Sequence, residues 1–226
     1  AHWHIQPAGV VADTFQSVTH IFQTTPEAFL MHLGSRGPAP AFESQKQINY
    51  KNLWAVEERR VTRVIQDFFP QAEWGELEVL CEVFNALPAD CNLHLANSMS
   101  VRYANLIGLT AKQAGIHVHC NRGTSGIDGC TSTAVGFALA NNQKLNVLIT
   151  GDLAFFYDRN AFWHNYSIPN LRILLLNNHG GIIFKMIDGP GNLPEADEYF
   201  VTRQQLNARK LCAEFNFRHL SLDNRR

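Results

Sequence analysis

The sequence predicts an α/β domain in which a parallel sheet is flanked by helices. From residue 74 onwards, short apolar segments alternate with segments of helical length. That alternation is the pattern of βαβ crossovers, which build a parallel sheet. Residues 171–176 form an almost continuous apolar run, as expected for a strand that is buried on both faces.

The composition limits the kind of protein. Of the 226 residues, 46% are hydrophobic and 17% are charged, which is enough for one full core and part of a second domain. A formal net charge of −1 indicates no global attraction to nucleic acid or to anionic membranes. No apolar run reaches the roughly 18 residues needed for membrane insertion, and we expect no secretory signal. Five cysteines without a CxxC pair are typical of reduced thiols in a cytoplasmic protein.

The expected elements follow in chain order. Glycines and prolines within residues 34–40 predict a loop. A helix rich in Glu and Arg is expected at 53–69, where Pro70 ends it and a domain boundary lies. We then expect helices at 74–87, 98–108, 127–141 and 154–163, and strands at 92–96, 116–120, 146–150 and 171–176. An apparent last strand, 217–222, has no covering element after it, which indicates a domain truncated at its C-terminus.

Two of the expected strands run directly into polar pairs. Gly151-Asp152 follows the strand 146–150, and Asn177-Asn178 follows the strand 171–176. Open α/β sheets bind ligands at the carboxyl ends of their strands. Asp152 and Asn178 are 26 positions apart, which allows one crossover helix, so the two strand ends can be neighbours. Carboxylate, amide and carbonyl oxygens suit Mg²⁺, and a helix beginning near Ala154 would direct its first amides at phosphates.

Each pair alone is typical of a turn or a loop; the two together at this spacing favour a ligand site. Gly-Asp followed after roughly 25 residues by Asn-Asn resembles the diphosphate-binding motif of thiamine-diphosphate enzymes. Four segments narrow the resemblance to the 2-succinyl-5-enolpyruvyl-6-hydroxy-3-cyclohexene-1-carboxylate synthases of menaquinone biosynthesis. These segments are residues 94–102, 121–129, 151–153 and 177–184, and Asn-Arg-Gly-Thr-Ser-Gly-Ile-Asp-Gly at 121–129 is the most specific.

The resemblance covers most of the chain and implies its domains. Residues 1–50 resemble the tail of that family's central domain, 51–73 a linker helix, and 74–226 its diphosphate- and magnesium-binding domain. Leu153 stands where the wider superfamily has glycine, but leucine agrees with this family.

The resemblance also assigns the cofactor site. It makes the Asp152 carboxylate, the Asn178 side chain and the Gly180 carbonyl the ligands of Mg²⁺ or Mn²⁺. Ile127 would lie under thiamine diphosphate and hold it in its bent conformation, for which a rigid β-branched side chain is suited. The remaining expected cofactor-binding residues are Asn97, Ser125, Gly151, Leu153, Ala154 and Ile183.

Four residues are expected to face the substrates. Ser98, Arg102 and Arg122 would contact 2-oxoglutarate and isochorismate, and Phe184 would form an apolar wall. Both substrates are dicarboxylates, which guanidinium groups bind through paired hydrogen bonds. The alternative for Arg102 is a solvated helix face. Ser98 and Arg102 are four residues apart and so share a face of their helix.

The implied reaction belongs to a transferase of aldehyde or ketone residues. The cofactor attacks the keto carbon of 2-oxoglutarate, CO2 leaves, and the four-carbon nucleophile adds to isochorismate. In this superfamily the activating glutamate comes from an N-terminal domain of the opposite subunit. We therefore expect a homodimer or homotetramer, and we expect the 226-residue chain alone to be inactive. The small-residue face formed by Ala134 and Ala138 is expected to pack against a partner.

Two local features have structural interpretations. Residues 125–128 fit a helix-capping box, so Asp128 reads as a cap rather than a catalyst. His117 and His119 alternate on one expected strand but lack a second pair at zinc spacing, which disfavours a metal site.

Three alternatives stay open. Another thiamine-diphosphate lyase or decarboxylase, of the acetolactate-synthase kind, would share the strand-end pairs but would not need Arg102 and Arg122. A non-catalytic diphosphate- or nucleotide-binding module would also bind ADP-like ligands. A purely structural domain would lose no binding on substitution of Asp152.

Overall fold

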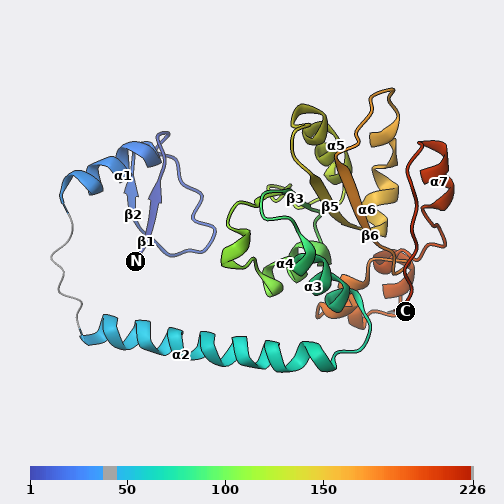
Figure 1. The fold of residues 1–226 in the computed structure, drawn as a ribbon. Coiled ribbons are helices and arrows are strands. Elements are labelled where there is room, and N and C mark those ends of the chain that lie inside the picture. Colours follow the sequence, from blue (N-terminus) through green and yellow to red (C-terminus); the bar gives the residue numbers. More distant parts are fainter. Residues whose placement is uncertain (38–44, 225–226) are drawn as a thin grey trace. The chain divides into compact units, whose positions relative to one another are not determined.

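The structure is a computed structural model that describes residues 1–37 and 45–224 (Figure 1). The chain divides into two compact units, Ala1–Phe68 and Phe69–Arg226. The loop predicted at 34–40 lies partly outside the described residues, since only positions up to 37 are described. Its first part, Gly34-Ser35, instead belongs to a helix.

The first unit contains two parallel strands and two helices. Strands β1 (His2–Ile5) and β2 (Val18–Phe22) pair with each other, and α1 (Pro26–Ser35) follows them. The Thr25 side chain accepts a hydrogen bond from the Ala28 amide and so caps α1, and the ring of Phe29 packs 4.8 Å from that of Phe22. Helix α2 (Gln45–Phe68) has no buried residue and begins earlier than the predicted residue 53.

The second unit is built on a four-stranded parallel sheet. Its strands are β3 (Asn92–Leu95), β4 (His117–Cys120), β5 (Asn146–Gly151) and β6 (Leu171–Leu176), in the order β4-β3-β5-β6. All four predicted strands and their parallel arrangement are confirmed. In the pairing of β5 with β6, Gly151 lies opposite Leu176. The two strands therefore end side by side.

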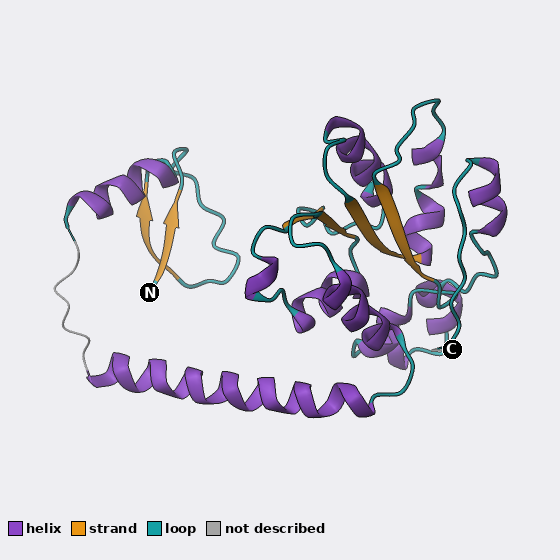
Figure 2. Ribbon diagram, in the orientation of Figure 1, coloured by secondary structure: helices purple, strands orange, loops and turns teal. Residues whose placement is uncertain are grey.

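Helices cover both faces of this sheet (Figure 2). The helices are α3 (Glu76–Ala86), α4 (Met99–Ile107), α5 (Cys130–Ala140), α6 (Asp152–Tyr157) and α7 (Arg209–Glu214). Alternate residues of β5 point into different cores: Val147 and Ile149 pack with α3 and α4, and Leu148 packs with α5 and α6. This period of two is the one expected for a strand that is buried on both faces.

Shorter helical turns complete the unit. They are η1 (Phe69–Gln71), η2 (Ala111–Gln113), η3 (Arg159–Phe162), η4 (Ile182–Met186), η5 (Pro190–Asn192) and the π-helical turn η6 (Ala196–Val201). Pro70 lies within η1, directly after α2, so the predicted end of that helix is confirmed. None of the described helices combines the length and the apolar character that a membrane span requires.

Near the predicted site, the starts of α5 and α6 differ from the prediction. Helix α5 begins at Cys130 rather than at residue 127, because Gly129 adopts a left-handed conformation (φ 75°) just before it. The capping box predicted at 125–128 is therefore wrong, and the Ser125 hydroxyl instead donates to the Arg122 carbonyl. Helix α6 begins at Asp152, two residues before Ala154, and ends at Tyr157; η3 is a separate turn.

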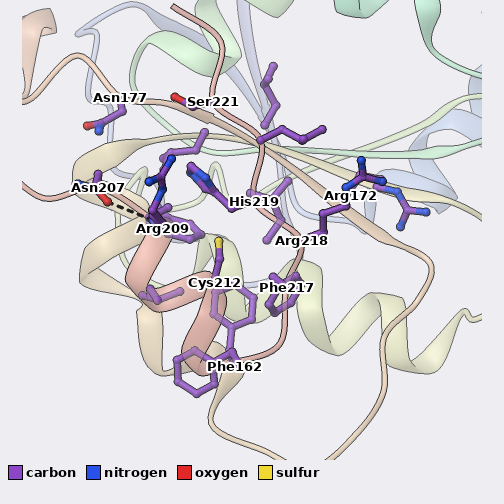
Figure 3. A pocket seen from close by; sticks show the side chains of 18 of the residues that line it. Phe162, Arg172, Asn177, Asn207, Arg209, Cys212, Phe217, Arg218, His219 and Ser221 are labelled. Atoms are coloured by element: carbon purple, nitrogen blue, oxygen red, sulfur yellow. Dashed lines mark hydrogen bonds between the residues drawn. The ribbon is translucent and has the colours of Figure 1, made fainter.

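The predicted strand at 217–222 is also wrong. Helix α7 ends in a left-handed turn at Asn216 (φ 59°), and the Phe217 amide donates to the Cys212 carbonyl. The ring of Phe217 then packs 4.9 Å from that of Phe162, which anchors the segment away from β6. Between β6 and this segment lies an open cavity of about 1780 Å³, so the two do not pair (Figure 3).

The two alanines of α5 contradict a further expectation. Ala134 and Ala138 are fully buried and pack in the core with Leu148, Phe155 and Leu171. Their small side chains let α5 approach the sheet of the same chain. They do not form a surface for a partner.

Candidate active site

The polar pairs after β5 and β6 lie together, as predicted. Asp152 begins α6 directly after β5, and its side chain is buried, with 2% of the residue exposed. The Gln204 side-chain amide bridges the two pairs. Its Nε2 donates to Asp152 Oδ2 over 2.7 Å and to Asn177 Oδ1 over 3.0 Å. The two strand ends thus form one hydrogen-bonded cluster.

Asp152 is a buried carboxylate whose hydrogen bonds come from neutral donors. The Leu153 amide donates to Oδ1 over 2.7 Å, and Gln204 donates to Oδ2. Among the described residues, no basic side chain forms an ion pair with it. Burial of a negative charge is costly when only neutral groups compensate it. A divalent cation at this carboxylate would supply the missing charge.

Asn178 is oriented by a residue that is distant in sequence. Its Nδ2 donates to Glu76 Oε1 over 2.7 Å, and its Oδ1 accepts from the Gly180 amide over 3.3 Å. Glu76 lies in the first turn of α3. The pKa of the Tyr103 hydroxyl is raised, mainly because the group is buried. The charge of Glu76 and its hydrogen bond to Tyr103 raise this pKa further. Glu76 therefore links Asn178 to α4, where Tyr103 lies.

The loop after Asn178 is closely packed against the segment that carries Gln204. A Cβ atom on Gly180 would come within 2.9 Å of Val201 Cγ1 and 3.0 Å of the Val201 carbonyl, so only glycine fits there. The Gly181 amide donates to the Val201 carbonyl over 2.6 Å. His179, with φ 65°, accepts from the Gln204 amide through its carbonyl. The loop backbone is thereby held in one conformation.

This donor set fits the predicted metal. A carboxylate, a side-chain amide oxygen and a backbone carbonyl are the hard oxygen ligands that Mg²⁺ prefers. Within the described residues, no group of three or more His, Cys, Asp or Glu side chains is arranged to bind a metal. The predicted Mg²⁺ site has one carboxylate, Asp152, and two neutral oxygens, so it is not a group of that kind. The amide of Leu153 is hydrogen-bonded to Asp152, and Ala154 is buried in α6.

Asn97 organises the loop between β4 and α5. It is 2% exposed, and its Nδ2 donates to the carbonyls of Asn121 (2.8 Å) and Gly126 (2.6 Å). Its Oδ1 accepts from Arg122 Nη1 over 3.0 Å. The loop that carries Ser125 and Ile127 is therefore tied to the end of β3. Ile127 remains 37% exposed there.

Ser98 and Arg102 contact each other at the start of α4. Ser98 precedes the helix with an unusual backbone conformation (φ 71°, ψ −132°), of the kind found at functional sites. Arg102 is exposed, and its Nη1 donates to the Ser98 carbonyl over 2.8 Å. This contact brings the Arg102 side chain to the backbone of Ser98; the shared face predicted for their two side chains remains a prediction.

Phe184 and Ile183 lie in η4, next to the glycine loop. The rings of Phe184 and Phe200 are 5.8 Å apart. A Cβ atom on Gly181 would lie 3.3 Å from both Phe184 Cδ2 and Leu153 Cδ1. Phe184 therefore packs on the same side of the loop as Leu153.

The histidines of β3 and β4 form a core pair. His94 and His119 stack with their ring centroids 4.9 Å apart, and Phe137 of α5 packs against both. His94 Nε2 is 3.1 Å from Asn146 Oδ1, whereas His119 Nε2 is buried without a hydrogen-bond partner among the described residues. Burial lowers the pKa of both imidazoles, and the neighbouring His119 and His117, respectively, lower it further. The rings of His94 and His119 therefore pack against Phe137, whereas His117 of the same strand is exposed.

Sequence reasoning missed Glu76 and Gln204. An acidic residue in the first turn of a helix is common for electrostatic reasons alone, so Glu76 carried no special signal. Gln204 lies in a segment without periodicity or motif. Only the folded chain brings them to Asn178 and Asp152.

Comparison with known proteins was made on the whole chain. No protein-family model matches it. It is 45% identical over 224 residues to the 2-succinyl-5-enolpyruvyl-6-hydroxy-3-cyclohexene-1-carboxylate synthase of Cytophaga hutchinsonii, which covers 99% of this chain and 38% of that protein. Proteins of the same name from Bacteroides thetaiotaomicron and Flavobacterium psychrophilum are 37% and 36% identical, over 99% and 96% of this chain and 37% of each relative.

The chain thus spans less than two fifths of the length of the curated relatives it matches. Because it covers 99% of this chain, the match runs through both units of the fold. The chain is therefore homologous, over almost all of its own residues, to part of the 2-succinyl-5-enolpyruvyl-6-hydroxy-3-cyclohexene-1-carboxylate synthases.

Proposed function

We propose that this chain supplies the metal- and diphosphate-binding part of a thiamine-diphosphate-dependent 2-succinyl-5-enolpyruvyl-6-hydroxy-3-cyclohexene-1-carboxylate synthase. The observation that supports this most is the buried Asp152 carboxylate, which has no cationic partner among the described residues and lies at a strand end beside the Asn-Asn pair. The homology to synthases of that name supports the choice of reaction. Residues 1–50 are proposed as the tail of a central domain, 51–73 as a linker, and 74–226 as the cofactor-binding domain.

In this proposal, Asp152, Asn178 and Gly180 bind Mg²⁺ or Mn²⁺. Asp152 contributes the negative charge, and Asn178 contributes its amide oxygen, whose orientation follows from the bond of its Nδ2 to Glu76. Gly180 contributes its carbonyl, which the close approach of Val201 holds in place. The backbone of Gly151, Leu153 and Ala154 contacts the diphosphate. Asn97, Ser125, Ile127 and Ile183 complete the proposed cofactor contacts.

Arg102 and Arg122 are proposed to bind the carboxylates of 2-oxoglutarate and isochorismate. Both are exposed, and each uses one Nη1 for a contact within the chain: Arg102 donates to the Ser98 carbonyl, and Arg122 donates to Asn97 Oδ1 after β3. A guanidinium has five N–H donors, so each retains donors for a substrate. Ser98 would contact substrate beside Arg102, and Phe184 would form an apolar wall.

Thiamine diphosphate, when bound, supplies the nucleophile and the electron sink for decarboxylation of 2-oxoglutarate and addition to isochorismate. The protein's residues orient the two dicarboxylates and stabilise their charge. The glutamate that activates the cofactor is proposed to come from another subunit of a homodimer or homotetramer. The five free cysteines agree with a cytoplasmic location, which is part of the same proposal.

Calorimetric titration of the full-length protein with thiamine diphosphate tests the site. With Mg²⁺ present, we expect Asp152→Asn to weaken binding by at least about 100-fold, because a carboxylate ligand of the metal is lost. Asp188→Asn, at an exposed carboxylate, is the matched control and should bind normally. Equal affinity of wild type and Asp152→Asn would refute the metal site.

Two further measurements separate the alternatives. Tight binding of ADP in place of thiamine diphosphate would favour a nucleotide-binding module. CO2 release from 2-oxoglutarate that does not depend on isochorismate would count against the proposed reaction, as would a preference for pyruvate.

A further inference from the structure

Gln204 connects the two strand ends, yet no sequence motif marks it. Its Nε2 lies 2.7 Å from Asp152 Oδ2 and 3.0 Å from Asn177 Oδ1. It comes from the segment between η6 and α7, 52 positions beyond Asp152. A single neutral amide thus contacts the buried carboxylate and one residue of the Asn-Asn pair.

The orientation of this amide is determined at its other end. The Leu206 amide donates to Gln204 Oε1, so the NH2 group, and not the oxygen, faces Asp152. The Gln204 backbone amide donates to the His179 carbonyl over 3.2 Å, and Asn177 Nδ2 donates to the Leu206 carbonyl over 3.1 Å. These bonds attach residues 204–206 to the loop that follows β6. Three hydrogen bonds therefore hold Gln204 and its neighbour Leu206: one to the Gln204 side chain, one from the Gln204 backbone and one to the Leu206 carbonyl.

We propose that Gln204 is a positioning residue of the metal site, a proposal that rests on the assignment of Asp152 as a metal ligand. A carboxylate that binds a metal is commonly oriented by a hydrogen bond from a neighbouring residue, and loss of that bond weakens metal binding. Asp152 Oδ2 has two lone pairs, so it can accept from Gln204 and still bind a cation. Through Asn177, the same amide also sets the position of the loop that carries Asn178 and Gly180.

A positioning role and a blocking role for Gln204 predict opposite effects on metal binding. If Gln204 merely replaced the cation, its removal would free Asp152 and metal binding would become tighter. If it orients the carboxylate, its removal leaves Asp152 able to rotate and metal binding becomes weaker. The sign of the change in metal affinity therefore decides between the two.

The experiment is a titration of the full-length protein with Mn²⁺, followed by the electron paramagnetic resonance signal of the free ion, with thiamine diphosphate in excess. Gln204→Met keeps the length of the side chain but removes the donor, and Gln205→Met, at the exposed neighbour, is the matched control. We expect Mn²⁺ to bind about 10- to 100-fold more weakly to Gln204→Met and normally to Gln205→Met. The bound-Mn²⁺ spectrum of Gln204→Met should also change, because the ligand geometry at Asp152 is altered.

Thermal unfolding without metal checks that the variant is folded, and its midpoint should fall by no more than about 5 °C. Unchanged or tighter Mn²⁺ binding by Gln204→Met would overturn the positioning role. Asp152→Asn, measured in parallel, separates the two proposals. If it loses Mn²⁺ while Gln204→Met retains it, only the role of Gln204 fails; if it binds Mn²⁺ normally, the metal site itself is wrongly assigned.

Discussion

The two halves of the sheet end differently at its carboxyl edge. At the ends of β5 and β6, Asp152 is buried and hydrogen-bonded, and Gln204 and Glu76 orient the polar pairs. At the ends of β3 and β4, Arg102, Arg122 and Ile127 are exposed. The first half is a site whose geometry this chain determines by itself. The β3–β4 half presents charged and apolar groups to solvent. Asn97 holds the loop after β4 through hydrogen bonds to two of its carbonyls.

This difference matches the two tasks proposed for the site. A small divalent cation requires ligands at closely defined positions, which buried and hydrogen-bonded side chains provide. Substrates must enter and leave, so the groups that bind them have to be reached from solvent. Substitutions at the ends of β3 and β4 should therefore change the stability of the loop or the binding of substrates, and should leave the affinity for the metal unchanged.

The largest effect that tests this separation is expected at Asn97. Asn97→Ala removes two partly buried hydrogen bonds, to the Asn121 and Gly126 carbonyls, and should lower the free energy of unfolding by about 2–3 kcal/mol. Urea denaturation measures this change, and Asn142→Ala, at an exposed position, should alter it by less than about 0.5 kcal/mol. Measured without thiamine diphosphate, the Mn²⁺ affinity of the folded variant should stay within about twofold of wild type, because Asn97 is not one of the proposed metal ligands. An equal loss of metal binding would show that the two halves are coupled.

Arg102 should affect substrates and not the metal. Arg102→Gln removes the positive charge, so the KM for 2-oxoglutarate or isochorismate should rise about tenfold, which corresponds to about 1.4 kcal/mol. Steady-state kinetics of the full-length protein give this value, and Mn²⁺ titration of the same variant should be normal. Arg159→Gln, at an exposed arginine of η3, provides the control. Unchanged KM values for both substrates would make Arg102 a solvated surface residue.

The smallest expected effect is on the pH dependence of stability, which should involve His94 of β3 and His119 of β4. Burial lowers the pKa of His94 and His119 in the folded chain, so the unfolded chain binds more protons once the pH falls below about 6.5. Stability should therefore decrease as the pH is lowered from 7.5 to 5.5. His119→Phe preserves the ring contacts and should make this decrease smaller, because one imidazole with a lowered pKa is removed.

Urea denaturation at the two pH values measures the difference. His117→Gln, at the exposed histidine of the same strand, should retain most of the decrease. An unchanged pH dependence in His119→Phe would mean that the pair does not contribute to acid sensitivity.

Much of the fold could be predicted because it depends on local patterns. The four strands of the second unit were predicted from short apolar runs, and their parallel order agrees with the alternation of strands and helices. The strand-end pairs were predicted to meet, and the register of Gly151 opposite Leu176 explains why they do. The predicted roles of the site residues remain predictions.

The errors arose where a local pattern competes with contacts between distant residues. Residues 217–222 were predicted to form a strand, but the packing of Phe217 on Phe162 carries them away from β6. Residues 125–128 match a capping box, yet the helix begins at Cys130, after the left-handed Gly129. Asn97 holds the loop before it through the Gly126 carbonyl. The small side chains of Ala134 and Ala138 suit either a partner or the core of the same chain, and the core is what they form.

The sequence by itself determined the α/β class, the four strands and the polar pairs at their ends, because these depend on residues that are close together in the chain. Only the tertiary structure decided which residues support those pairs. Glu76 reaches Asn178 across 102 positions, and Gln204 reaches Asp152 across 52. A hydrogen bond between two side chains leaves no periodic trace in the sequence, since it requires only that folding bring one donor and one acceptor within reach. For that reason the sequence, through its resemblance to the synthases, predicted Asp152 and Asn178 as candidate ligands, and the fold was needed to show which side chains orient them.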